Sequence, residues 1–262
     1  MGDLVRLRAR LRDLERVTVA FSGGADSAFL AWVAHDTLGR DAAHAVTAVS
    51  PSLAPDEHAD CAALAREWGL RWTGVKTDEH ARPAYAANGS DRCYHCKAEL
   101  MDVVVPLAMA EGATVVLGTN VDDLADHRPG QAAAAERGAE FPLVEAGFTK
   151  AEVRAASRAL GLRTWDKPAA ACLASRVPYG TAVTVEVLSR VGRAEAALRA
   201  MGFVRLRVRH YGDIARVEVD EDALVRAVER RTEVVAAVKA SGYQYVTLDL
   251  EGFRSGNLNA AL

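Results

Sequence analysis

Hydrophobic and polar positions alternate with two different periods along the first part of the chain, and the two periods indicate strands and helices in turn. Short apolar runs are typical of buried strands, whereas apolar positions three and four residues apart indicate one face of a helix. The runs predict strands at residues 17–21, 43–50, 70–77 and 113–120. The helical spacing predicts helices at residues 4–14, 26–39, 54–69, 90–110 and 149–161. This alternation indicates an α/β fold, with a parallel sheet covered by helices on both faces.

Local signals refine two of these helices. Thr149 and Glu152 have the spacing of a capping box, and Gly161 marks the end of the same helix. In the helix at residues 90–110, one apolar stripe is expected to face the sheet; it consists of Leu100, Val103, Val104 and Leu107.

The pattern changes after about Trp165 and predicts a small α+β domain. Its expected elements are helices at residues 181–202 and 221–242 and strands at residues 203–210, 214–220 and 243–250. The connection before them, "DKPAAACLASRVPYG", is bounded by prolines and carries a cysteine. We therefore expect two domains, at residues 1–165 and 166–262.

Composition narrows the class of protein. Half of the 262 residues are hydrophobic and 26% are charged, as in ordinary globular proteins. The formal charge of −3 argues against a nucleic-acid partner, and no apolar run reaches membrane-spanning length. The first residues are charged and amphipathic and lack the apolar core of a secretory signal, so a cytoplasmic location is expected.

The loop "SGGADS", residues 22–27, joins the first strand to the second predicted helix. Paired glycines at a helix N-terminus expose backbone N–H groups that can cradle phosphate. Ser22 and Ser27 can add hydroxyl donors beside Gly23 and Gly24, and Asp26 can hold Mg²⁺ between phosphate oxygens. The loop lacks the lysine of the Walker pattern.

A second polar segment, "GTNVDDLADHRPG", follows the strand at residues 113–120. Open parallel sheets bind ligands at the carboxyl ends of their strands, so this segment is expected at the same nucleotide site. Its candidate residues are Gly118, Asp122, Asp123, Asp126 and Arg128.

Three of the four cysteines are candidates for chemistry. Cys93 and Cys96 share one face at the start of a predicted helix, where the helix dipole favours thiolates. They could be a redox pair, or ligands of zinc together with Cys172, His95 or His127. Three cysteines also suit a [4Fe–4S] cluster with one iron that lacks a protein ligand. Cys61 lies among alanines in a helical pattern and is expected to be a buried, inert thiol.

Three arginines alternate with apolar residues in the strand predicted at residues 203–210. Arg205, Arg207 and Arg209 therefore share one face of that strand. The face could be exposed to solvent, or it could bind an anion that relieves the repulsion between like charges.

These motifs together resemble known proteins. The loop "SGGADS" is similar to the pyrophosphate loop (PP-loop) of the ATP pyrophosphatases, whose adenine nucleotide α-hydrolase-like domain splits ATP between its α and β phosphates. Over nearly the whole chain, the sequence resembles the LarE family of sulfur insertases, which act in nickel-pincer nucleotide biosynthesis. The matching segments are "SGGADS", "RCYHCK", "GTNVDDLADHRPG", "PLVEAGFTKAEVRA", "WDKPAAACLASRVPYG", "RVRHYGDIARVEV" and "YVTLDLEGFRSGNLN".

The resemblance implies an activity and a set of residues. The family adenylates a carboxylate of a pyridinium dicarboxylate mononucleotide and replaces oxygen with sulfur, for a cofactor used by lactate racemase. Some members have one cysteine, at the position of Cys172, and give up its sulfur. Others add the CxxC pair, and the resemblance to these implies a [4Fe–4S] cluster on Cys93, Cys96 and Cys172 that is recharged by sulfide or another sulfur donor.

The resemblance also implies roles for the C-terminal domain, which is expected to bind substrate and to form a homo-oligomer. Arg207 and Arg209 would contact the substrate phosphate, and Ser175 and Arg176 would lie near the adenylate. Glu195 is a weaker candidate, as a metal ligand.

Three alternatives share parts of this pattern. A tRNA thiolase can combine the same loop with a cluster, and an amide-forming synthetase can use the same adenylate with ammonia. A nucleotide-binding protein without enzymatic activity would keep the loop alone.

Overall fold

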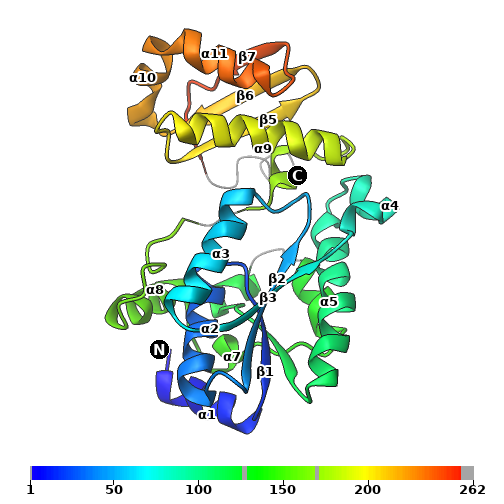
Figure 1. The fold of residues 1–262 in the computed structure, drawn as a ribbon, viewed down its shortest axis with the longest axis vertical. Helices are drawn as coiled ribbons and strands as arrows, with labels where there is room; N and C mark the ends of the chain where they lie inside the picture. Colours follow the sequence, from blue (N-terminus) through cyan, green and yellow to red (C-terminus); the bar gives the residue numbers. More distant parts are fainter. Residues whose placement is uncertain (1, 126–128, 169–170, 255–262) are drawn as a thin grey trace. The chain divides into compact units, whose positions relative to one another are not determined.

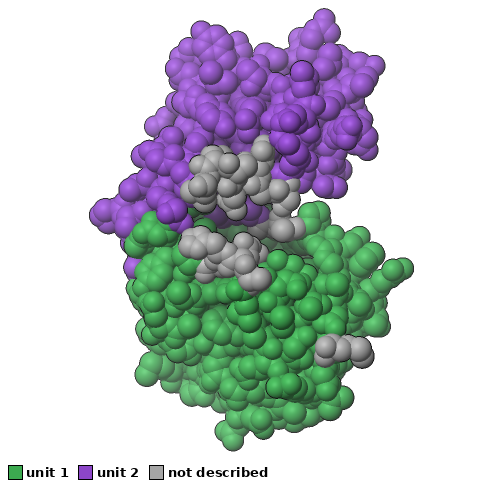
Figure 2. All heavy atoms as spheres, turned by 180° about the vertical axis from the view of Figure 1, so that it is seen from behind, with its two compact units in different colours: residues 1–79, 91–170 green, residues 80–90, 171–262 purple. Residues whose placement is uncertain are grey.

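A computed structural model describes residues 2–125, 129–168 and 171–254 of the chain. The chain forms two compact units (Figure 2). Unit 1 consists of residues 1–79 and 91–170, and unit 2 of residues 80–90 and 171–262. Residues 80–90 interrupt unit 1 in sequence, a feature that the hydrophobic pattern did not indicate.

Unit 1 contains a four-stranded sheet with helices on both faces (Figure 1). Its strands are β1 (Val17–Ala20), β2 (Ala43–Val49), β3 (Arg71–Lys76) and β4 (Thr114–Leu117). Its helices include α1 (Leu4–Asp13), α2 (Ala25–Leu38), α3 (Pro55–Glu67), α5 (Arg92–Ala110), α6 (Pro129–Ala135), α7 (Pro142–Glu145) and α8 (Lys150–Ala159). The short 3₁₀ turn η2 (Val121–Ala125) follows β4, and η1 (Glu79–Ala81) begins where the chain leaves unit 1.

The strand order is β3-β2-β1-β4 and every pair is parallel, which confirms the predicted α/β fold. Ala20, the last residue of β1, pairs with Val46 on one side and with Leu117 on the other. The order therefore reverses between β1 and β4, and the segments that follow these two strands leave the sheet side by side. Open parallel sheets bind ligands at such a switch point.

Apolar residues form a separate core on each face of the sheet. On one face, Val19 and Val116 pack with Phe29 of α2 and Leu64 of α3. On the other face, Val115 and Leu117 pack with Met101 and Val104 of α5. Strands buried on both sides explain the continuous apolar runs in the sequence.

The apolar stripe predicted for α5 is wrong at one position. Leu107 is 42% exposed, and the buried apolar residues of α5 are Ala98, Met101, Val104 and Ala108. Leu100 and Val103 are only partly buried. The buried face thus includes small alanines, which a search for large apolar side chains does not detect.

Unit 2 has a three-stranded sheet of order β5-β6-β7. The strands are β5 (Leu206–Tyr211), β6 (Ile214–Val219) and β7 (Tyr245–Leu248); β5 and β6 are antiparallel, whereas β6 and β7 are parallel. Helices α9 (Val185–Ala200) and α11 (Arg231–Ala240) share its core with Val208 and Val217. The remaining elements are α4 (Pro83–Ala86), η3 (Leu173–Arg176), η4 (Glu221–Ala223) and α10 (Leu224–Glu229).

The single helix predicted at residues 221–242 is wrong, because the structure divides it into η4, α10 and α11. The break falls at Arg230, whose guanidinium donates to the Met201 carbonyl at 2.8 Å and to Glu233 at 2.6 Å. Ala227 before the break and Val234 after it both reach the core. The bend thus lets both short helices cover the sheet.

Among the described residues, no helix is long and apolar enough to cross a membrane.

The capping box predicted for α8 is confirmed. The Thr149 hydroxyl accepts from the Glu152 N–H at 3.3 Å, and the Glu152 carboxylate accepts from the Thr149 N–H at 2.9 Å. We expect Thr149→Ala to lower the free energy of unfolding by about 1 kcal/mol, because the Glu152 N–H in the first turn of the helix loses its acceptor. Denaturant titration measures this loss, and Thr149→Ser should show little of it.

Candidate active site

The loop at residues 22–27 is held in shape by its own serines. The Ser27 hydroxyl donates to the Gly24 carbonyl at 3.2 Å and lies 3.0 Å from the Ser22 hydroxyl. The Ser22 N–H donates to the Ser27 oxygen at 3.2 Å. Within the described residues no side chain caps α2, so its first N–H groups remain directed to the end of the helix. The loop is thus preformed for an anion.

Gly23 can only be a glycine in this conformation. Its φ of +70° lies in the left-handed region, and a Cβ atom there would lie 2.8 Å from the Cys61 sulfur. Cys61 is fully buried, and burial raises the pKa of its thiol to about 11. The thiol therefore stays neutral, as expected for a structural cysteine.

Gly118 brings the second polar segment against the loop. A Cβ atom at Gly118 would lie 2.7 Å from the Ser27 nitrogen and 2.9 Å from the Asp26 carbonyl carbon. The end of β4 thus lies directly against the backbone of the first turn of α2. The two segments that we predicted to form one nucleotide site are adjacent.

Asn120 joins the two segments and Lys150 places a positive charge beside them; the sequence analysis missed both. The Asn120 side chain is fully buried and donates to Asp26 Oδ1 at 3.1 Å. Lys150 Nζ lies 2.9 Å from Asp123 Oδ1. Asn120 lies within "GTNVDD" and could have been found, whereas nothing near Lys150 in sequence points to this site.

The electrostatics of this cluster favour a cation. Burial raises the pKa of Asp26 and the nearby Asp123 carboxylate raises it further, whereas Asn120 and Lys150 lower it. The net effect is a raised pKa, so the Asp26 carboxylate lacks full compensation. A magnesium ion that bridges phosphate oxygens would supply this compensation, and carboxylate oxygens are suitable ligands for it.

The other predicted residues of this segment have different outcomes. Asp122 accepts from the Lys150 N–H at 2.8 Å and so caps α8. Asp126, His127 and Arg128 lie outside the described residues, and their roles stay predictions.

The cysteines fall into two groups by exposure. Cys93 and Cys96 lie in the first two turns of α5 in unit 1; Cys93 is exposed and Cys96 is half-buried. Cys172 is exposed in unit 2, immediately before η3. All three are free thiols, which fits ligands of a cluster, whereas the buried Cys61 does not. No group of three or more His, Cys, Asp or Glu side chains forms a metal site among the described residues.

Arg176 holds the segment that carries Cys172. The guanidinium is 3% exposed and makes a bidentate pair with Glu195, at 2.8 and 3.0 Å. Its remaining nitrogen donates to the carbonyls of Ala171 and Cys172, at 2.6 and 3.0 Å. Arg176 also donates to the Ser175 hydroxyl at 2.9 Å. The structure thus gives Arg176 a positioning role for Cys172, and its expected contact with the adenylate stays a prediction.

Glu195 is engaged in holding this arrangement, not exposed as a metal ligand. Its two oxygens also accept from Arg199 at 2.9 Å and from the Val208 N–H at 3.0 Å. Burial alone would raise the pKa of Glu195, but the hydrogen bonds and charge of Arg176 outweigh burial and lower it. The fully buried carboxylate is therefore an anion that is satisfied by protein donors.

The three arginines that we expected on one strand face lie in different environments, and only Arg207 and Arg209 belong to β5. Arg209 is 5% exposed and makes a bidentate pair with the buried Glu218, at 3.0 and 2.9 Å; it also donates to the Ser175 carbonyl at 2.9 Å. Arg205 is exposed and pairs with Asp220 at 3.3 Å. Arg207 is partly buried and lies 4.9 Å from the Phe253 ring centroid.

Arg207 is the arginine whose surroundings favour an anion. Burial lowers its pKa to about 10, and the positive charges of Arg176 and Arg209 contribute to the shift. A negative ligand would relieve this repulsion.

A parallel sheet with a serine–glycine loop at its switch point defines an ATP-using enzyme of the PP-loop class. The sequence profile of the NAD synthase family matches residues 3–99. The chain is 40% identical, over 98% of its length and 93% of the relative's, to pyridinium-3,5-bisthiocarboxylic acid mononucleotide synthase of Lactiplantibacillus plantarum. It is also 48% identical, over 100% of its length and 98% of the relative's, to an uncharacterized protein of a Synechocystis species. The chain therefore belongs to the LarE family of ATP-using sulfurtransferases.

We expect Asn120→Ala to raise the pKa of Asp26 further, because it removes a hydrogen bond to the ionised carboxylate. Asp26 would then take up its proton at a higher pH than in the wild type. Carboxyl NMR over a pH titration measures the change. Gln131→Ala is the matched control, since Gln131 donates to the Asp123 carbonyl at 3.3 Å. An unchanged Asp26 titration in Asn120→Ala would contradict the assigned bond.

We expect Arg176→Met to lower the local stability of unit 2 by about 3 kcal/mol, because Glu195 loses its bidentate partner inside the core. Hydrogen exchange at the amides of α9 and β5 measures this. Arg199→Met removes a more exposed partner of the same carboxylate, at 28% side-chain exposure. It should cost about 1 kcal/mol or less. Equal losses in the two variants would show that Arg176 is not the main partner.

Proposed function

We propose that this enzyme activates a carboxylate of a pyridinium dicarboxylate mononucleotide with ATP and replaces its oxygen with sulfur, in the cytoplasm. The observation that carries the proposal is the identity of 40% to pyridinium-3,5-bisthiocarboxylic acid mononucleotide synthase, because it extends over 98% of this chain. A product with two thiocarboxylates requires that the sequence of steps occurs twice on one substrate.

The first step is adenylation. A carboxylate oxygen of the substrate attacks the α phosphorus of ATP, the bond to the β-phosphate oxygen breaks, and pyrophosphate leaves. The N–H groups at the start of α2 and the hydroxyls of Ser22 and Ser27 would bind the departing pyrophosphate. Asp26, oriented by Asn120, would hold Mg²⁺ against the phosphate oxygens.

Substrate binding would depend on unit 2. Arg207 is the candidate for the substrate phosphate, since its pKa is lowered by burial and by neighbouring arginines. Arg209 would contribute charge to this site, but its hydrogen bonds to Glu218 and the Ser175 carbonyl make it primarily a positioning residue.

A second copy of the chain would complete a homo-oligomer through unit 2. Tyr211, Ile214 and Tyr245 are 41%, 40% and 62% exposed, and Ile214 is paired in register with both tyrosines. Residues paired in register share one face of a sheet, so the three form an apolar patch.

The second step is transfer of sulfur to the activated carbon, with departure of AMP. Cys93, Cys96 and Cys172 would together hold a [4Fe–4S] cluster, and their exposure as free thiols fits this role. When bound, such a cluster would supply a sulfide as the nucleophile, and a sulfur donor would restore it. Arg176 would fix the backbone of Cys172 during this step.

We expect Cys93→Ala, Cys96→Ala and Cys172→Ala to retain pyrophosphate release and to lose sulfur transfer over repeated turnovers. Protein purified without oxygen should also lose bound iron in each variant, since each removes one thiolate ligand. Pyrophosphate, thiolated product, iron and acid-labile sulfide are measured for each.

Cys61→Ala is the control, because its thiol is buried beside Gly23 and should not hold iron. If Cys96→Ala formed thiolated product over many turnovers, the cluster would not be the source of sulfur.

A further inference from the structure

The loop at residues 22–27 contains no lysine, yet an ammonium group from elsewhere in unit 1 lies beside it. A Cβ atom built at Gly23 would lie 3.7 Å from Lys167 Nζ. Lys167 lies 140 residues after the end of the loop in sequence, by 167 − 27, within the segment "WDKPAAACLASRVPYG".

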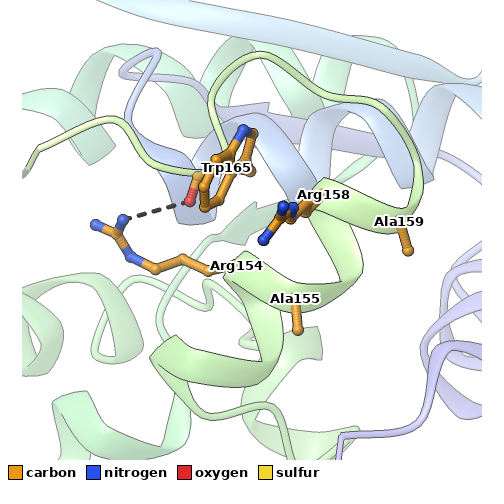
Figure 3. A pocket seen from close by; sticks show the side chains of 5 residues that line it. All are labelled: Arg154, Ala155, Arg158, Ala159 and Trp165. Atoms are coloured by element: carbon orange, nitrogen blue, oxygen red, sulfur yellow. Dashed lines mark hydrogen bonds between the residues drawn. The ribbon is translucent and has the colours of Figure 1, made fainter.

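Hydrogen bonds hold both the side chain and the backbone carbonyl of Lys167. Its Nζ atom donates to Glu57 at 2.8 Å and to Asp60 at 2.7 Å, both on α3. Its carbonyl accepts from Arg154 of α8 at 3.0 Å. Arg154 also donates to the Trp165 carbonyl at 3.3 Å, in the hollow that lies over α8 (Figure 3). The segment before Lys167 is thus fixed to α8.

The ammonium also stays charged. Burial alone would lower the pKa of Lys167, but the hydrogen bonds and charges of Asp60 and Glu57 outweigh burial and raise it. Its side chain is 17% exposed, so solvent or a ligand can reach part of it.

We propose that Lys167 binds the β and γ phosphates of ATP and the departing pyrophosphate, as the cation that the loop itself lacks. The N–H groups of the loop supply only partial charges, and an Mg²⁺ ion held by Asp26 would neutralise only part of the charge of a polyphosphate, so a further positive charge nearby favours binding. Glu57 and Asp60 keep the ammonium in place and compete with phosphate for it. This inference rests on the proposed use of ATP.

The test is calorimetric titration of the full chain with magnesium pyrophosphate, ATP and AMP. We expect Lys167→Met to weaken the binding of pyrophosphate and of ATP by about 10- to 100-fold, the usual effect of losing a charged hydrogen bond. AMP lacks the β and γ phosphates, so its affinity should change by less than about 2-fold. Arg158→Met is the matched control, because it removes a positive charge from the same part of unit 1, where Arg158 lies 4.9 Å from the Trp165 ring centroid, and should leave all three affinities unchanged.

A second variant keeps the test decisive if Lys167→Met does not fold, which thermal unfolding would show. Glu57→Gln retains Lys167 but removes one competing carboxylate, so pyrophosphate should bind more tightly. Unchanged pyrophosphate binding in Lys167→Met, equal weakening of AMP, or weaker pyrophosphate binding in Glu57→Gln would each overturn the role of Lys167. Wild-type protein that binds neither ATP nor pyrophosphate would overturn the proposed function as well.

Discussion

The close contact between Gly118 and the backbone of Ser27 is the constraint on which the nucleotide site depends. Any side chain at Gly118 would collide with the first turn of α2 and separate β4 from the loop. The contact lies where the strand order reverses, the usual ligand position of an open parallel sheet. It also sets the distance over which Asn120 reaches Asp26. The absence of a side chain at Gly118 therefore lets the anion-binding loop lie directly against the end of β4, which the acidic segment follows.

Unit 2 uses the same kind of side chain for two purposes. Arg176 and Arg209 bind buried carboxylates and the backbone around Cys172, whereas Arg207 donates to the Leu206 carbonyl at 2.8 Å and lies 4.9 Å from the Phe253 ring centroid. Buried ion pairs contribute modestly to stability but are costly to break, so they specify one geometry. The two buried pairs thus fix the shape of the segment around Cys172, and the guanidinium groups of Arg176 and Arg209 add positive charge near Arg207, which Glu195 opposes in part.

Local patterns were sufficient for most of the fold and for the loop. Strands buried on both faces, a capping box and a strand–glycine–helix junction each carry their signal within about ten residues. The pairing of Arg209 with Glu218 could not be predicted, because it depends on the register between two strands. The position of Lys150 depends on how α8 packs. The break at Arg230 depends on the Met201 carbonyl, which accepts from Arg230 at the end of α9. Tertiary contacts decide such features, and no short window contains them.

The membership of residues 80–90 in unit 2 has a consequence for how the chain acquires its structure. Asn88 donates to the carbonyls of Val177, Pro178 and Thr181, at 3.3, 2.8 and 2.9 Å. During synthesis these partners emerge about ninety residues after Asn88, so residues 80–90 lack them until the second half of unit 1, residues 91–170, has been made. The chain also passes between the units three times, at residues 79–80, 90–91 and 170–171. Neither unit is a continuous stretch of sequence, and a single cut of the gene cannot yield both intact.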